Sequence, residues 1–193
     1  MAFIGLRNFI VAKIESDTDE GTKYSEIKKL KGARVASMSP QVAEGGGLYG
    51  DDQLLENESS LTSIDVSIEL ASLSLEDEAF LKGGTYENGV YKENKDDSAP
   101  EIALGFMAPK SKTGGGGFRM VWLVKGTASA GTDEEFNTKE DSIEYGTPTM
   151  DFTFTPRLSD GELRFKADTN EEGAPDESAF FTVEFLQKGA VTA

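Results

Sequence analysis

The sequence contains neither cysteine nor histidine among its 193 residues. Without cysteine, the chain can form no disulfide and no thiolate nucleophile. Without histidine as well, it cannot build Ser-His-Asp or Cys-His catalytic groups, or the usual zinc and haem sites. Catalysis would depend on carboxylates, Lys, Tyr or Ser/Lys pairs alone. We therefore expect a protein that is not an enzyme, with no cofactor and no metal.

Long hydrophobic runs and basic stripes are also missing. The longest apolar stretch is far short of the roughly 20 residues that span a bilayer. The apolar N-terminus lacks a basic start and is interrupted by Arg7 and Asn8, so we predict no signal peptide. Lys and Arg number 19 against 35 Asp and Glu, for a net charge of -16. Because so acidic a surface repels nucleic acid, we expect no specific DNA binding. Because no apolar run is long enough to span a bilayer, we also expect no membrane partner.

Strand patterns dominate what is present. Ile64, Val66, Ile68 and Leu70 alternate with Asp65, Ser67 and Glu69, which is the period of a half-buried strand. Similar alternation occurs at 102–107, 150–155 and 162–167. The run 118–126 is apolar on both faces and predicts a central strand. Asn88-Gly89 and Asp160-Gly161 are hairpin signals.

Two stretches favour helix. Residues 74–83 have Ser74 as a potential N-cap, acidic residues in the first turn and Gly83 as a stop. Near the C-terminus, residues 175–189 begin with Pro175-Asp176 and end with Lys188-Gly189, and we favour helix over strand there.

Two Gly-rich stretches are predicted as loops, at 40–62 and 109–117. Residues 45–50 formally match the G-x-G-x-x-G nucleotide fingerprint, but Asp51 and Asp52 follow at once and would repel a pyrophosphate. The acidic region at 133–144 could supply a carboxylate pair, with Glu134, Glu135 and Asp141 as candidates, yet a solvated surface is the favoured interpretation.

Several segments together resemble the major tail proteins of long-tailed, siphovirus-type phages of Gram-positive bacteria. The similar segments run in order over most of the chain. They are GLRNFIVAKI (5–14), KKLKGARVASMSPQV (28–42), LYGDD (48–52), the strand at 63–71, the helix at 75–82, APEIALGF (99–106), FRMVWLVKG (118–126), YGTPTMDFTFTPR (145–157) and GELRFKADTN (161–170).

The resemblance implies a single domain over 1–193, mainly β, with two packed antiparallel sheets in a β-sandwich of tail-tube type, a short flanking helix and a C-terminal helix. It also implies an N-terminal arm and a long 40–62 loop. Such proteins form homo-hexameric rings that stack into a tail tube, and DNA passes through the tube. A tape-measure protein and a tail terminator are the further partners, and the location is the virion tail, after assembly in the host cytoplasm.

The residues agree with this expectation in two places. In the loop, the apolar side chains of a polar segment are best buried on the next ring. We therefore predict an inter-ring interface of Leu48, Tyr49, Asp51, Asp52, Leu54 and Leu55. In the alternating strand, we predict that Asp65, Ser67 and Glu69 face the lumen. Three alternatives stay open: another tube-forming or tail-terminator protein of a phage-like or secretion system, a carbohydrate-binding β-sandwich module, and an enzyme that uses carboxylates alone.

Overall fold

The computed structural model describes residues 2–45, 48–50, 53–56, 59–134, 136, 138 and 146–190. Strands account for most of this part of the chain. In chain order they are β1 Arg7–Thr18, β2 Gly21–Tyr24, β3 Lys28–Lys29, β4 Ala33–Glu44, β5 Leu48–Gly50, β6 Gln53–Glu56, β7 Ser59–Leu70, β8 Thr85–Glu87, β9 Val90–Lys92, β10 Ile102–Pro109, β11 Phe118–Asp133, β12 Thr149–Phe154 and β13 Arg164–Asp168. The prediction of a mainly β protein is confirmed.

Nine strands form one antiparallel sheet in the order β2-β1-β10-β11-β12-β7-β4, to which β13 adds on β11 and β3 on β1. The central strand is β11, and its residues 120–124 are all buried, as the apolar run predicts. One edge of β11 has two partners: β13 pairs with Arg119–Leu123, and β12 pairs with the part from Gly126 to Asp133. The Asp160-Gly161 turn therefore does not close a hairpin as predicted, since both flanking strands pair with β11.

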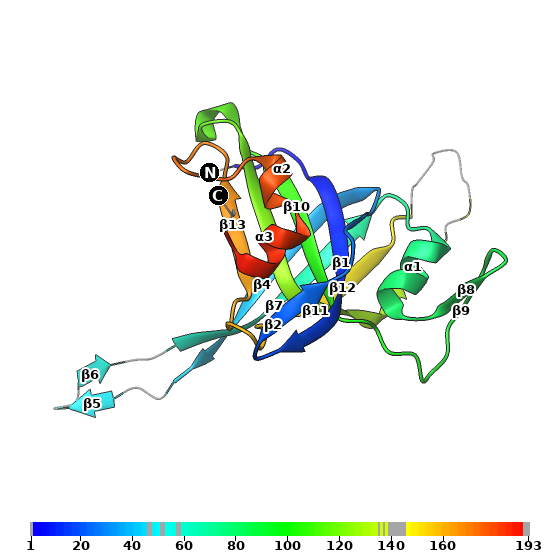
Figure 1. Ribbon diagram of the computed structural model, residues 1–193, viewed down its shortest axis with the longest axis horizontal. Coiled ribbons are helices and arrows are strands. Elements are labelled where there is room, and N and C mark those ends of the chain that lie inside the picture. Colours follow the sequence, from blue (N-terminus) through cyan, green and yellow to red (C-terminus); the bar gives the residue numbers. More distant parts are fainter. Residues whose placement is uncertain are drawn as a thin grey trace.

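Two apolar clusters lie against the sheet. The first joins Phe9 and Val11 of β1 to Ile64 and Val66 of β7, although these strands are far apart in the strand order. The sheet therefore curves around this cluster, and Figure 1 shows β4, β7 and β12 crossing behind β1, β10 and β11. The second cluster includes Trp122 and lies under the C-terminal helices. Alternation along the strands sends successive side chains to the two clusters.

Helices occupy the two predicted places. Helix α1 (Leu75–Lys82) begins at Ser74, whose hydroxyl accepts the Asp77 N–H at 3.1 Å, and ends at left-handed Gly83. The C-terminal prediction is confirmed as helix, but Thr182 divides it into α2 (Glu177–Phe180) and α3 (Val183–Lys188) by capping α3. A 3₁₀ turn, η1 (Lys112–Gly114), lies in the β10–β11 connection. No helix of the described residues is long and apolar enough to cross a membrane.

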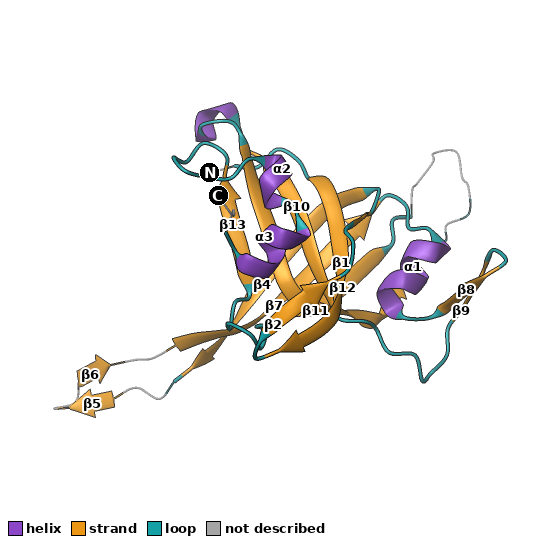
Figure 2. Ribbon diagram, viewed as in Figure 1, coloured by secondary structure: helices purple, strands orange, loops and turns teal. Residues whose placement is uncertain are grey.

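The predicted 40–62 loop is wrong as a loop. Strands β4 and β7 continue into it as a paired ladder that ends at Glu44 and Ser59, and β5 pairs with β6 beyond it. Figure 2 shows this projection leaving the body. The residues on both sides of the glycine run are compatible with strands. They pair because a hairpin satisfies the backbone hydrogen bonds of both strands. We call residues 41–44, 48–50, 53–56 and 59–63 the arm.

Residues before β1, expected as an N-terminal arm, lie along the end of β10. Phe3 forms an isolated bridge with Lys110, and the Ile4 N–H donates to the Pro109 carbonyl at 2.9 Å. The Phe3 side chain is 46% exposed, and the Arg119 guanidinium lies over its ring, 5.3 Å from the centroid.

Candidate functional site

The predicted lumen residues share one face of β7. Ile64, Val66, Ile68 and Leu70 are at most 2% exposed, whereas Asp65 is exposed and Ser67 and Glu69 are half-buried. The alternation predicted for this strand is therefore confirmed, and its polar side lies opposite the first apolar cluster.

Neighbouring strands extend this polar side across the sheet. In the strand register, Ser37 of β4, Ser67 of β7 and Asp151 of β12 lie in one row, and Ser39, Asp65 and Thr153 lie in the next. We call the surface formed by Ser37, Ser39, Asp65, Ser67, Glu69, Asp151 and Thr153 the outer face. Most of these residues line a shallow depression of about 370 Å³. Ser37, Ser39 and Ser67 have small side chains, which leave room for the depression above the sheet.

Charge on the outer face is mainly negative. The Asp65 carboxylate accepts hydrogen bonds from Gln41 Nε2 at 2.9 Å and from the Thr153 hydroxyl at 3.0 Å, which are both neutral donors. Glu69, in contrast, pairs with Arg34 at 2.7 Å. Arg34 therefore neutralises one end of the face, while Asp65 has no cationic partner among the described residues.

Asp151, Ser37 and Ser39 also belong to this surface, although they were not among the predicted lumen residues. Asp151 lies in the recognised alternation at 150–155, so its side of the strand was readable from the pattern. Which strands pair with one another was not readable, because the partners are more than 25 residues apart in sequence and no local signal specifies them.

The base of the arm exposes an apolar pair. Beyond the Ile64–Phe154 pair, β12 ends, and β4 and β7 pair only with each other. There Val42 and Leu61 are direct cross-strand partners, and they are 53% and 44% exposed. Because both side chains are about half exposed, they contribute little hydrophobic stabilisation within one copy of the chain.

The predicted inter-ring residues lie at the far end of the arm. Leu48 and Tyr49 belong to β5, and Leu54 and Leu55 belong to β6, with Tyr49 paired to Leu54. Asp51 and Asp52 lie outside the described residues, between these two strands in the sequence.

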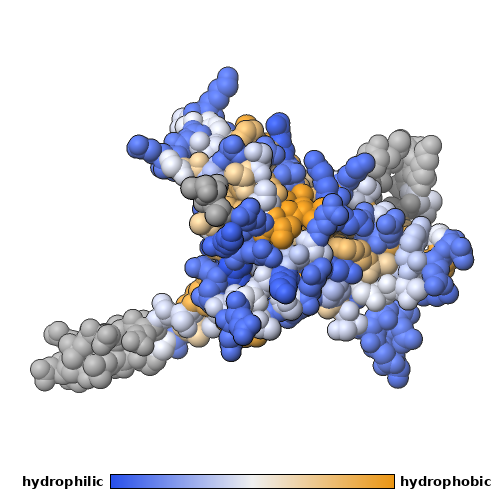
Figure 3. Space-filling model, viewed as in Figure 1, coloured by the Kyte–Doolittle hydropathy of each residue, from blue (hydrophilic) through white to orange (hydrophobic). Residues whose placement is uncertain are grey.

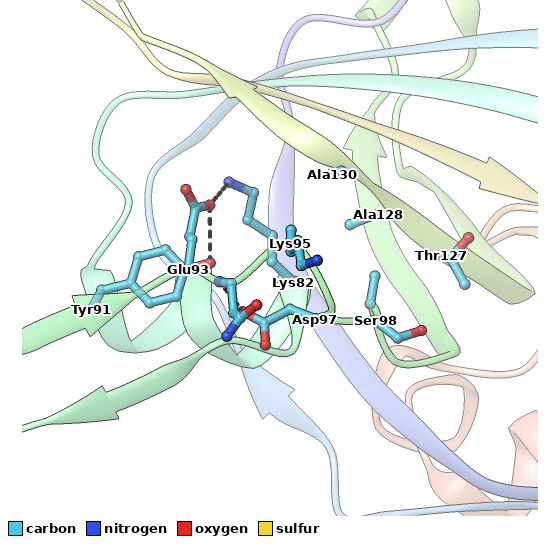
Figure 4. Close-up of a pocket in the computed structure, with 11 residues that line it drawn as sticks. Lys82, Tyr91, Glu93, Lys95, Asp97, Ser98, Thr127, Ala128 and Ala130 are labelled. Carbon is cyan, nitrogen blue, oxygen red and sulfur yellow. Dashed lines mark hydrogen bonds and ion pairs between the residues drawn. The ribbon is translucent and has the colours of Figure 1, made fainter.

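A separate polar pocket of about 590 Å³ lies between α1, the β8–β9 hairpin and β11 (Figure 4). Lys82 donates to Glu78 at 3.1 Å and to Glu93 at 2.5 Å, and the Tyr91 hydroxyl also donates to Glu93. Burial alone would lower the Lys82 pKa, but bonds to Glu93 and Glu78 outweigh it and raise that pKa. Burial and Glu93 raise the pKa of Tyr91 to about 12. Both groups therefore keep their protons at neutral pH, and the three side chains form a cluster held by an ion pair and hydrogen bonds.

The carboxylates considered for catalysis form no described pair. Glu134 directly follows β11, whereas Glu135 and Asp141 lie outside the described residues. Within the described part of the chain, no cluster of three or more acidic side chains is arranged to hold a metal ion.

Neither a scan against models of known protein families nor a search of curated proteins finds a match to this chain. Structural support for a proposal of function therefore comes from the outer face, the arm and the edges of the sheet.

Proposed function

We propose that this protein is a structural subunit that assembles as stacked hexameric rings into the tail tube of a long-tailed phage, with DNA passing through the lumen. In this proposal it has no enzymatic activity, and a tape-measure protein and a tail terminator are its further partners in the virion. The resemblance to major tail proteins motivates the proposal, and three features of the structure support it.

The main structural support for this proposal comes from the arm. Two strands leave the body together and expose Val42 and Leu61 beside each other. Burying such a side chain against another subunit contributes on the order of 1–2 kcal/mol. A ring of six subunits repeats that contribution six times, so a modest contact per subunit is sufficient for stacking.

Open sheet edges supply the contacts within a ring. Strand β4 ends the strand order and is 12 residues long, and β13 and β2 are edge strands elsewhere in the sheet. A long exposed edge pairs readily with another chain, and ring closure uses up such edges in a controlled way. We further propose that β4–β7–β12 and β1–β10–β11 act as the two layers of a sandwich, packed across the first apolar cluster.

The outer face suits a lumen wall. Asp65 and Asp151 place fixed negative charge among small hydroxyl side chains, and Asp65 has no cationic partner among the described residues. DNA phosphates are repelled by such a wall over about 8 Å at physiological salt. A wall with small side chains and negative charge would let DNA pass without binding to it.

The direct test is negative-stain microscopy of the concentrated protein, which is expected to show rings or tubes. A matched variant replaces residues 45–58 by Asn-Gly, a two-residue turn that joins Glu44 to its partner Ser59. We expect this variant to keep the wild-type melting temperature, because the core is unchanged, and to form no tubes.

Two results would contradict the proposal. Tubes of normal length from the shortened variant would show that the part of the arm beyond Glu44 and Ser59 does not connect rings. A strictly monomeric wild-type protein that binds glycans on an oligosaccharide array would favour the carbohydrate-binding module instead.

A further inference from the structure

A small cationic groove interrupts the acidic surface. It has a volume of about 240 Å³ and lies between the start of β1 and the segment that leads into β4. Arg7, Lys29 and Lys31 line it and are exposed, and no carboxylate appears in its lining among the described residues. The three cations form no basic stripe in the sequence; they come together because β3 pairing brings Lys29 beside Ile10 of β1, near Arg7.

These cations are available to a partner. Nine other Lys and Arg side chains form ion pairs, including Lys28 with Asp77 and Arg34 with Glu69 on either side of the groove. Within the described residues, none of the three groove cations has an ion-pair partner. Arg7 is held over the Phe118 ring, 5.9 Å from its centroid, which orients the guanidinium without neutralising it.

The groove and the arm lie at opposite ends of the same two strands. β4 begins beside the groove at Ala33 and ends in the arm at Glu44, and β7 returns along it. The Ala71 N–H donates to the Gly32 carbonyl, which joins the groove to the end of β7. At about 3.3 Å per residue, the two ends are about 36 Å apart. Figure 1 shows β4 running from the arm across the body.

Charge differs sharply between these ends. Residues 44–58 contain five acidic residues and no Lys or Arg: Glu44, Asp51, Asp52, Glu56 and Glu58. Asp51, Asp52 and Glu58 lie outside the described residues, so this charge is a property of the sequence of the segment. A chain with an acidic segment at one end of these strands and exposed cations at the other can pair head to tail with a second copy, and such heterologous contacts build stacks.

We infer that the Arg7–Lys29–Lys31 groove is the receptor for the acidic arm of a second copy of this chain. The inference rests on the proposed function and specifies which surface receives the arm. A second cationic place, Arg164 and Lys166 on β13, fits less well. It lies on the edge of the sheet rather than at the end opposite the arm.

A charge-swap experiment tests this pairing. Lys29→Glu/Lys31→Glu, and separately Glu44→Lys/Glu56→Lys, are each expected to raise the protein concentration needed for tubes at least about tenfold, because like charges then face each other. Combining all four substitutions is expected to restore assembly to within about threefold of wild type. The combined variant should also fail to co-assemble with wild type.

Lys23→Glu/Lys95→Glu is the matched control, since both side chains are exposed and have no ion-pair partner among the described residues. It should assemble normally. Circular dichroism and melting temperature verify folding, and Lys29→Gln/Lys31→Gln replaces the reversal if that variant unfolds. The inference is overturned if the groove variants assemble like wild type, if the combination restores nothing, or if groove substitutions alter only binding of a DNA oligonucleotide.

The outcomes separate the two proposals. Wild-type tubes together with an ineffective charge swap refute the groove as receptor and leave the tube subunit standing. A wild-type protein that forms no ordered assembly refutes the tube subunit, and the receptor falls with it.

Discussion

Replacing Phe180 by alanine is expected to be among the most damaging single changes outside the first apolar cluster. Phe180 is fully buried, and its ring lies 4.6 Å from the Phe185 ring and 5.1 Å from the Phe181 ring. Its carbonyl also accepts the Trp122 indole N–H at 2.9 Å. Truncating a buried Phe costs about 3–5 kcal/mol. For a chain of this size, we therefore expect the melting temperature to fall by about 10 °C.

Urea unfolding followed by both fluorescence and far-ultraviolet circular dichroism measures the effect. Trp122 is the sole tryptophan and contacts the C-terminal helices, so its emission reports on them directly. Phe136→Ala is the matched control, because Phe136 is 87% exposed and its loss should change stability by less than about 0.5 kcal/mol. A Phe180→Ala cost below about 1 kcal/mol would refute the reasoning. So would a wild-type fluorescence transition well before the dichroism transition, since the helices would then detach separately from the sheet.

Gly105→Ala is expected to cost about 1–3 kcal/mol in urea unfolding, because its Cβ would lie 2.8 Å from the Trp122 ring. Gly131→Ala, with nothing within 4 Å, is the control, and equal effects would contradict the packing argument. Asp17→Asn should cost about 2 kcal/mol at pH 7. Burial alone would raise the Asp17 pKa, but the Lys125 ammonium and other donors hold it below its usual value. A lowered carboxyl pKa stabilises the fold above about pH 4, and this contribution is lost as the pH falls through the folded-state pKa. Unfolding at pH 7 and near pH 2 should therefore show the wild type and Asp17→Asn converging in acid, and a difference independent of pH would contradict this.

Local signals predicted the elements that depend on local chemistry. The alternation around Asp65, the caps of α1 and the central position of β11 follow from side chains within a few residues of one another. The arm was mistaken for a loop because glycine and acidic residues dominate its composition, although pairing across it holds the ladder as far as Glu44.

Long-range pairing was not predictable in the same way. Two strands, β12 and β13, share one edge of β11. Between Ala128 and Thr132 the register shifts, so that β11 has more residues there than its partner β12. The groove has the same origin. Lys29 and Lys31 are close in sequence, but Arg7 reaches them only through strand pairing, and their neighbours Lys28 and Arg34 are neutralised by acids distant in sequence. In Figure 3, hydrophilic residues cover most of the visible face, and a smaller apolar area lies beside the C-terminal helices.

The way the arm enters the body has a mechanical consequence. Strand β7 passes from the arm directly into its ladder with β12, which extends from Ile64 to Glu69. Sheet hydrogen bonds lie perpendicular to the strands, so tension along the arm loads all the bonds of this ladder together, in shear. Force across the arm would instead open the β4–β7 bonds one after another. The protein should therefore be stiffest along the axis of the arm, the direction in which stacked copies would pull on one another.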